Sequence, residues 1–244
     1  MKKYAAERRR VAISFHEQAS RKNTDVPIDD KGIVSFKHAL EIFDQLADRP
    51  DIAFAYTQDG CYARAHLMCR AMAMLGLAPQ KAWAFESDGI YSPCLYVTMP
   101  NGKKEEWGWH VAPALLVRMP DCSVQNLVFD PGLFDGPVTA HDWADLIHAH
   151  QENLQIVPFG TAPNGYTGHY LPHDPYANPD THAKETMLKY LKWQDRAPRI
   201  VFQTDARRIF CRKKRIRLLK AGKTWVSVRQ QPHAVKEKTR ALKQ

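Results

Sequence analysis

A cysteine stands at the expected start of a long apolar helix, in the stretch Asp59-Gly60-Cys61-Tyr62-Ala63-Arg64-Ala65-His66. The free N–H groups in the first turn of a helix carry partial positive charge, which favours a thiolate over a thiol. A cysteine in this position is therefore either a nucleophile or a small residue that fills space. A nucleophilic thiol needs a base to remove its proton and a third group to orient that base.

The base has to come from another part of the chain. His66 follows Cys61 by five positions, and at about 100° per residue this places it on a different side of the helix. Arg64 does share a face with Cys61 and can help to hold a thiolate. Two better partners are His110, inside an apolar strand, and Asp130, at the end of another. An isolated polar group is costly in both of these places.

Two adjacent strands packed on the cysteine's helix would bring Cys61, His110 and Asp130 together as nucleophile, base and orienting acid. A strand histidine with a satisfied hydrogen bond is nevertheless the commoner case. Spacing alone therefore leaves both interpretations open.

Hydrophobic periodicity predicts the elements that would position these residues. Ser35 is a suitable N-cap for a helix that Arg49-Pro50 ends, and the helix from Cys61 to Leu77 is apolar nearly all round, which is typical of a buried helix. Pro113 indicates a bulge or an edge in its strand. The expected strands are Ala82–Glu86, Cys94–Met99, Trp107–Arg118 and Val124–Phe129, followed by a helix after Thr139 and a short helix over Thr186–Trp193. This order predicts an α+β fold with a central buried helix packed on an antiparallel sheet.

Composition excludes several classes of protein. The 244 residues are 44% apolar and 25% charged, as in an ordinary globular protein. No apolar run is long enough to span a membrane, and the N-terminus does not resemble a secretory signal peptide. The five cysteines form no Cys-x-x-Cys pair, which disfavours a disulfide framework and structural zinc and favours a reducing compartment. A metal site at His148 and His150 is also disfavoured, because these two side chains would point to nearly opposite sides of a helix. No cofactor is predicted.

The net charge of +9 is unevenly distributed. Residues 196–244 hold sixteen Lys and Arg against Asp205 and Glu237, a net +14, so the rest of the chain is at −5. Alternating residues after Arg196 predict a basic β-hairpin with a flexible end. Such a hairpin can bind nucleic acid or an anionic surface, recruit an acidic protein, or be a solvated accessory element.

The stretch from Asp59 to His66 resembles the nucleophile motif of the bacterial protein glutaminases, which are protein-glutamine deamidases. Trp109-His110-Val111-Ala112 resembles the histidine motif of that family. Asp130-Pro131-Gly132-Leu133-Phe134, with Gly136-Pro137-Val138-Thr139 after it, resembles the aspartate motif. The three blocks follow the order of the family, and the similarity extends over about residues 33–154.

This resemblance implies a thiol hydrolase with a core related to papain and the transglutaminases. It assigns Cys61 as nucleophile, His110 as general base and acid, and Asp130 as orienting carboxylate, with the amide of a protein-bound glutamine as substrate. The N–H of Cys61 is the expected oxyanion donor. Tyr62, Trp107 and Trp109 either pack in the core or line the substrate site, and strand alternation places both tryptophans on the face opposite His110.

The resulting domain prediction has three parts: an N-terminal arm (1–32), a protein-glutaminase-like catalytic domain (33–195) and the basic segment (196–244). The alternatives to a deamidase are a transglutaminase, a papain-like cysteine protease, and a non-enzymatic binding module that acts through its basic segment. Without a secretory signal, the protein is expected in the cytoplasm of its producer or as an effector delivered into a target cell.

Overall fold

The computed structural model of the protein describes residues 27–86, 95–164, 178–194 and 201–204. By its internal contacts the chain divides into Met1–Arg208 and Ile209–Gln244, and every described residue lies in the first of these units. The predicted basic hairpin lies outside the described residues. The boundaries predicted at 32/33 and 195/196 stay predictions.

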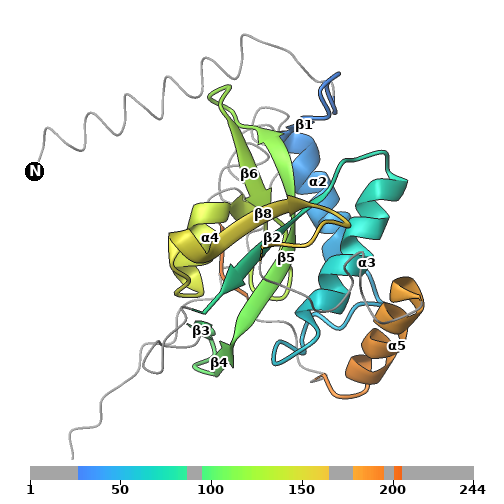
Figure 1. Cartoon of the computed structure of the whole chain (residues 1–244), viewed down its shortest axis with the longest axis vertical. Helices are drawn as coiled ribbons and strands as arrows, with labels where there is room; N and C mark the ends of the chain where they lie inside the picture. Colours follow the sequence, from blue (N-terminus) through green and yellow to red (C-terminus); the bar gives the residue numbers. More distant parts are fainter. Residues whose placement is uncertain (1–26, 87–94, 165–177, 195–200, 205–244) are drawn as a thin grey trace, which may run out of the picture. The chain divides into compact units, whose positions relative to one another are not determined.

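A mixed sheet, mostly antiparallel, forms the centre of the described unit (Figure 1). Its main path runs β7-β6-β5-β2-β8, and β1 pairs in parallel with β5. The long strand β5 occupies the middle of this path. The bounds are β1 Val34–Ser35, β2 Gln80–Phe85, β5 Trp109–Arg118, β6 Val124–Val128, β7 Val138–Thr139 and β8 Leu154–Pro158. The antiparallel sheet is as predicted, but the periodicity did not reveal β1, β7 or β8.

Of the predicted alternatives at Pro113, a bulge or an edge, the structure shows a local edge, because the ladder of β5 with β6 begins only at Ala114. Strand β5 is flanked by β2 on one side and by β6 on the other, and Pro113 lies opposite Lys81 of β2. Its carbonyl oxygen accepts a hydrogen bond from the N–H of Phe129, just beyond the end of β6. A backbone N–H at position 113 would point to the same side as this carbonyl, toward the chain beyond the end of β6. No ladder hydrogen bond is therefore lost because proline has no N–H. An interior strand can hold a proline at such a point without losing a ladder hydrogen bond.

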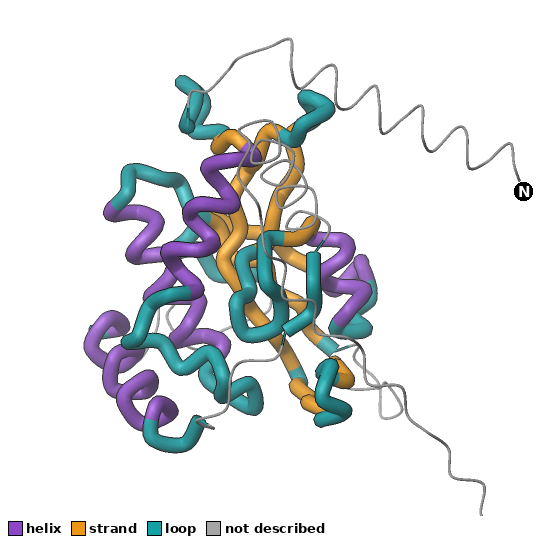
Figure 2. The backbone as a smooth tube through the Cα atoms, turned by 180° about the vertical axis from the view of Figure 1, so that it is seen from behind, coloured by secondary structure: helices purple, strands orange, loops and turns teal. Residues whose placement is uncertain are grey.

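Two helices cover one face of the sheet (Figures 1 and 2). Helix α2 (Phe36–Ala47) begins at Ser35, whose hydroxyl accepts from the N–H of His38 at 3.3 Å, as the N-cap prediction requires. Helix α3 (Cys61–Met74) is the predicted central helix, and Gly76, in the left-handed conformation, follows its end.

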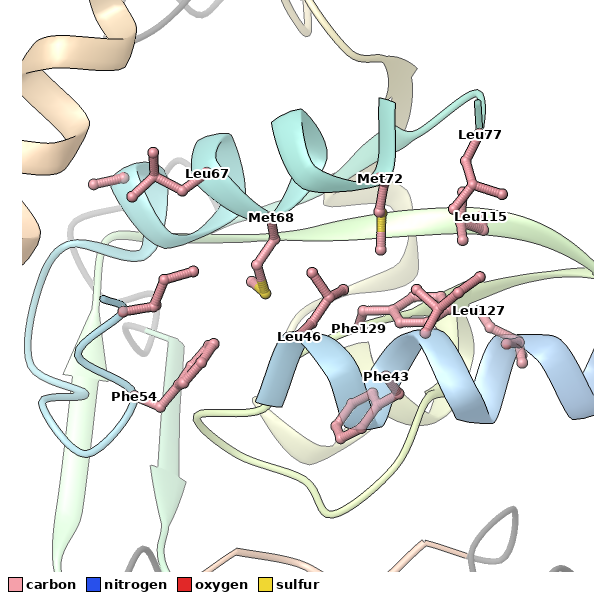
Figure 3. Close-up of a cluster of buried hydrophobic side chains, with 14 of the residues drawn as sticks. Phe43, Leu46, Phe54, Leu67, Met68, Met72, Leu77, Leu115, Leu127 and Phe129 are labelled. Carbon is pink, nitrogen blue, oxygen red and sulfur yellow. The ribbon is translucent and has the colours of Figure 1, made fainter. Parts of the chain in front are cut away.

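The core of this face lies between α3, α2 and the sheet (Figure 3). Met68 and Met72 of α3 point toward Phe43 and Leu46 of α2, with Phe129 beside them. Each large apolar side chain that is fully buried contributes about 1.5–3 kcal/mol to folding. This packing holds α3 firmly against the sheet.

The other face of the sheet is covered by α4 (Ala140–Leu146) and by the hairpin of β3 (Leu95–Thr98) and β4 (Lys104–Trp107). Alternation along β5 sends Ala112 and Ala114 to this face, while Leu115 and Val117 face α2 and α3. Thr139 caps α4, the helix predicted after it, by accepting from the N–H of Asp142 at 3.1 Å.

Helix α5 spans Pro179–Leu191, so it begins seven residues earlier than the predicted short helix at Thr186. Asn178 caps it by accepting from the N–H of Thr181, and Pro179 occupies its first turn, where a proline loses no helical hydrogen bond. This helix packs on α3 beside the core of Figure 3.

Residues 201–204 belong to the predicted basic segment, yet they pair with the core. The N–H of Phe202 donates to the carbonyl of Leu133, and the N–H of Asp135 donates to the carbonyl of Phe202. This short stretch therefore lies beside the turn that follows Asp130.

Within the described residues, no helix combines the length and the apolar character that crossing a membrane requires.

Candidate active site

Cys61 is the first residue of α3. Gly60 precedes it in the left-handed conformation with φ of 79° and accepts the first hydrogen bond of the helix, from the N–H of Arg64. No side chain caps this end of the helix. The sulfur of Cys61 therefore lies next to the uncapped N–H groups of a buried helix start, where negative charge is stabilised.

His110 and Asp130 are hydrogen-bonded to each other. His110 lies near the start of β5, Asp130 directly follows Phe129 at the end of β6, and the distance from Nε2 of the imidazole to Oδ2 of the carboxylate is 2.9 Å. Both side chains are buried. The second ring nitrogen, Nδ1, has no hydrogen bond of standard geometry to the described residues.

The thiol of Cys61 lies beside the imidazole of His110 and helps to raise its pKa. Because Asp130 occupies Nε2, the nitrogen left for the sulfur is Nδ1. The structure thus brings the three residues that the sequence analysis selected into one cluster, in the order sulfur, imidazole, carboxylate. Their catalytic roles stay predictions.

A tryptophan orients the carboxylate. The indole N–H of Trp143 in α4 donates to Oδ2 of Asp130 at 3.1 Å, and the carbonyl of Asp130 accepts from the N–H groups of Leu133 and Phe134 in the following turn. The Trp143 ring also stacks against His110, with 5.6 Å between centroids. The sequence analysis predicted only a helix after Thr139, with no role for Trp143. Its indole N–H pairs with a residue thirteen positions earlier, which no local pattern signals.

Burial and charge act in opposite directions on the pair. Burial lowers the pKa of His110, but the Asp130 carboxylate and the Cys61 sulfur outweigh it and raise that pKa from 6.5 to about 9. Burial likewise raises the pKa of Asp130, but His110, Trp143 and the charge of Arg64 outweigh it and lower that pKa. The imidazole therefore carries its second proton at neutral pH and faces an ionised carboxylate.

This pair makes stability depend on pH. A histidine whose pKa is raised by folding contributes stability that is complete below its unfolded pKa of 6.5 and is lost as the pH rises through about 9. We expect the unfolding free energy of the wild type, relative to that of His110→Gln, to fall between about pH 6.5 and pH 9.5. Urea unfolding of both proteins across this window measures the difference. A difference that stayed constant or grew with pH would contradict the proton assignment.

Trp107 has a different place from the one predicted. It ends β4, whereas Trp109 begins β5, and the indole of Trp107 stacks against His110 with 4.7 Å between centroids and 19° between planes. The prediction that Trp107 lies on the face opposite His110 is therefore wrong. It assumed one continuous strand, but the pairing of β4 with β3 ends at Trp107 and Gly108 separates the two strands.

Trp107 also contacts the loop in front of Cys61. Its indole N–H donates to the carbonyl of Thr57 at 2.9 Å, and the Thr57 hydroxyl donates to the buried carboxylate of Glu105 at 2.8 Å. Lys103 pairs with the same carboxylate at 2.7 Å. These hydrogen bonds and the Lys103 ion pair connect the β3–β4 hairpin to the loop before the cysteine, and the stacked ring of Trp107 connects both to the imidazole.

Tyr62 and Trp109 lie beside a small buried cluster that contains Cys61, Trp83 and Val111. The Tyr62 and Trp109 rings are 6.2 Å apart, and both side chains are partly exposed. Their position next to the thiol agrees with the predicted contact with substrate, which stays a prediction. Trp107 is buried against His110 and the Thr57 carbonyl, so its contacts point to orienting the imidazole.

Arg64 and His66 have structural partners. The Arg64 guanidinium donates to the carbonyls of Tyr56 and Asp59, at 2.7 and 2.8 Å, and so fixes the loop before Cys61. His66 hydrogen-bonds through Nε2 to Asp180 of α5 at 2.5 Å. His66 therefore points away from the cluster of Cys61, as its angular position on the helix predicted.

The described residues contain no group of three His, Cys, Asp or Glu side chains arranged to hold a metal ion. His148, excluded as a metal ligand from its spacing, hydrogen-bonds through Nδ1 to the carbonyl of Tyr96. Cys61, Cys69 and Cys122 are free cysteines in the described part of the chain, while Cys94 and Cys211 lie outside it.

Comparisons with known proteins show what the chain is similar to. A family model described as glutaminase matches residues 39–147, which contain Cys61, His110 and Asp130. Residues 39–147 belong to the glutaminase family. The fold is similar to three solved structures of protein-glutaminase. None of the curated proteins matches the chain.

A crystal structure of pro-protein-glutaminase superposes with a TM-score of 0.55 at 20% identity, over 73% of this chain and 63% of that one. A crystal structure of protein-glutaminase superposes with a TM-score of 0.53 at 20% identity, over 67% of this chain and 91% of that one. The NMR structure of protein-glutaminase from Chryseobacterium proteolyticum superposes with a TM-score of 0.54 at 21% identity, over 68% of this chain and 92% of that one. The chain thus spans less than two thirds of the pro-form and most of the two shorter chains.

A substitution at Gly60 tests how strongly the candidate site depends on the conformation of the residue before α3. A Cβ at Gly60 would lie 2.5 Å from Cε2 of Tyr190, and its φ of +79° strains any other residue. Backbone strain alone costs about 1–3 kcal/mol. We expect Gly60→Ala to lower the free energy of unfolding by more than this, because the contact with Tyr190 is disturbed as well. Gly76→Ala is the matched control, because Gly76 has φ of +77° and no atom within 4 Å of its Cβ position. Equal losses in urea unfolding would show that the contact with Tyr190 is unimportant.

Proposed function

We propose that this protein is a thiol hydrolase that deamidates protein-bound glutamine to glutamate, with Cys61 as nucleophile, His110 as acid and base, and Asp130 as the orienting carboxylate. The observation that carries the proposal is the buried imidazole, which hydrogen-bonds Asp130 and lies beside the Cys61 thiol at a helix start. We further propose that the core is related to those of papain and the transglutaminases.

The proposed reaction has two halves. His110 takes the proton of the Cys61 thiol, and the thiolate forms a bond to the carbonyl carbon of the glutamine side chain. The C–N bond then breaks as His110 gives that proton to the leaving ammonia. Water then attacks the thioester and gives a proton to His110, the C–S bond breaks, and the sulfur leaves with glutamate as the product. An imidazole with a pKa of about 9 already holds the proton that ammonia needs at neutral pH.

The negative charge that develops on the amide oxygen needs donors. The backbone N–H of Cys61 is free of helical hydrogen bonds because it belongs to the first turn of α3. It lies next to the sulfur that attacks, so it is the donor closest to the developing oxyanion. The partly exposed rings of Tyr62 and Trp109 are the groups of this region that would contact the glutamine side chain or the protein around it.

The setting of this reaction belongs to the proposal as well. The five cysteines form no Cys-x-x-Cys pair, which favours a reducing compartment, so we place the reaction in cytoplasm, either that of the producer or that of a target cell. Binding of nucleic acid or an anionic surface by residues 196–244 rests on their net charge of +14. Detection of the protein only inside its producer would argue against delivery.

One assay distinguishes the proposed reaction from its relatives. The protein is incubated with an unfolded, glutamine-rich protein, with and without a primary amine, and ammonia, substrate mass and chain termini are measured together. Deamidation predicts equal amounts of ammonia and new glutamate, with an intact chain. Incorporation of the amine would indicate a transglutaminase, and new termini would indicate a protease. Inactivity combined with salt-sensitive binding to nucleic acid would favour a binding module.

A further inference from the structure

Helix α5 contacts the turn that carries the candidate nucleophile, although α5 lies beyond the residues that the glutaminase model matches. The hydroxyl of Tyr190 donates a hydrogen bond to Oδ2 of Asp59. The other oxygen of this carboxylate, Oδ1, accepts from the N–H of Gly60 at 2.6 Å. One carboxylate thus connects the side chain of Tyr190 to the backbone directly before Cys61.

The ring of Tyr190 completes this contact. It lies against Gly60 so closely that a Cβ there would be 2.5 Å from Cε2 and 2.7 Å from Cδ2. It also packs on the ring of Tyr56, with 4.5 Å between centroids, and Tyr190 is hydrogen-bonded to Tyr62. The chain is therefore held on both sides of Gly60 and Cys61 by one tyrosine. Burial and the Asp59 carboxylate raise the pKa of Tyr190, so its hydroxyl keeps the proton that it donates.

We infer that Tyr190 is a positioning residue for Cys61: it fixes the Asp59 carboxylate, which fixes the peptide group in front of the nucleophile. This inference rests on the proposed function for its catalytic consequence. Gly60 is in the left-handed conformation, and a rotation of its peptide with Cys61 would turn the Cys61 N–H away from the site of the oxyanion. It would also displace the sulfur from His110. Small displacements of reacting groups reduce rates strongly.

The test removes one hydroxyl. Tyr190→Phe keeps the ring against Gly60 and Tyr56 but loses the hydrogen bond to Asp59, and we expect kcat for deamidation to fall by about tenfold to a hundredfold with little change in KM. Asp59→Ala is expected to behave like Tyr190→Phe, and the double variant to lose no more than the larger single loss, because the two groups act through one contact. Leu188→Ala on the exposed side of α5 is the control, with the activity of the wild type expected.

A second measurement does not depend on deamidation. The rate at which iodoacetamide alkylates Cys61 is followed by peptide mass mapping over a range of pH, in wild type, Tyr190→Phe and Leu188→Ala. We expect slower alkylation at neutral pH in Tyr190→Phe alone, by about tenfold, because the sulfur is then held less well beside His110 and the start of α3. Thermal unfolding of the three proteins shows that each is folded.

The outcomes separate the two claims. Slower alkylation in Tyr190→Phe without deamidation by the wild type would support the positioning role and refute the proposed function. Equal alkylation rates and equal kcat values in wild type and Tyr190→Phe would overturn the positioning role. A loss of activity shared equally by Leu188→Ala would overturn it too, because the effect would then come from α5 as a whole.

Discussion

Cys61→Ala is expected to abolish ammonia release from a glutamine-containing protein. The sulfur is the only heavy atom of the protein that forms a covalent bond to the substrate in the proposed reaction, and no other group can replace it. Removing the nucleophile from a triad that acts as a unit reduces kcat by about a millionfold. Alanine keeps the helix start intact and is small enough for this buried position, so the fold is expected to remain.

The matched control is Cys122→Ser. Cys122 is an exposed free cysteine outside the cluster, so its loss tests whether any thiol contributes. We expect wild-type rates for this variant, measured by ammonia release under the same conditions. If Cys61→Ala retained the rate of the wild type while Cys122→Ser did not, the assignment of the nucleophile would be wrong.

His110→Gln is expected to have a loss of similar size. Glutamine can still hydrogen-bond to Asp130, but it can neither accept a proton from the thiol nor give one to ammonia. A base that acts in one unit with its nucleophile contributes about a millionfold to kcat, and the orienting acid about a hundredfold less. Asp130→Asn should therefore retain more activity than His110→Gln, with ammonia release as the measure for both.

Folding has to be separated from chemistry in these variants. His110 is buried against Trp107 and Trp143, so thermal unfolding of His110→Gln and Asp130→Asn belongs beside the rates. A folded His110→Gln that was more active than Asp130→Asn would contradict the roles assigned to the two residues, because a positioning carboxylate cannot matter more than the group that it positions.

Local sequence patterns predicted the features that depend on local physics. The Ser35 cap, the start of α3 at Cys61 and the strand around His110 follow from capping chemistry and from hydrophobic periodicity, which act over a few residues. The grouping of Cys61, His110 and Asp130 was one of two open interpretations until the resemblance in three blocks of sequence supported it. The helix that packs on the sheet then brings these residues together in the structure.

The remaining features depend on contacts between distant parts of the chain. The hydrogen bond of Trp143 to Asp130, the contact of Tyr190 with Asp59 and the stacking of Trp107 on His110 join residues from separate elements, so no periodicity marks them. The choice between the two alternatives predicted at Pro113, a bulge or an edge, depends on such contacts too. Whether a proline is tolerated in an interior strand depends on where the neighbouring strand ends, and the strand's own sequence does not contain that information.

The central claim is that Cys61 forms a thioester with the glutamine side chain, and a single-turnover experiment tests it most directly. Excess protein is mixed with a glutamine-containing peptide and quenched in acid at successive times, and the Cys61 peptide, ammonia and glutamate are each measured by mass spectrometry or enzymatic assay. The account predicts that an adduct on Cys61, equal in mass to the peptide minus ammonia, rises together with ammonia and decays as glutamate forms. Glutamate formed at the wild-type rate by Cys61→Ala, with no adduct on the wild-type cysteine, would contradict it.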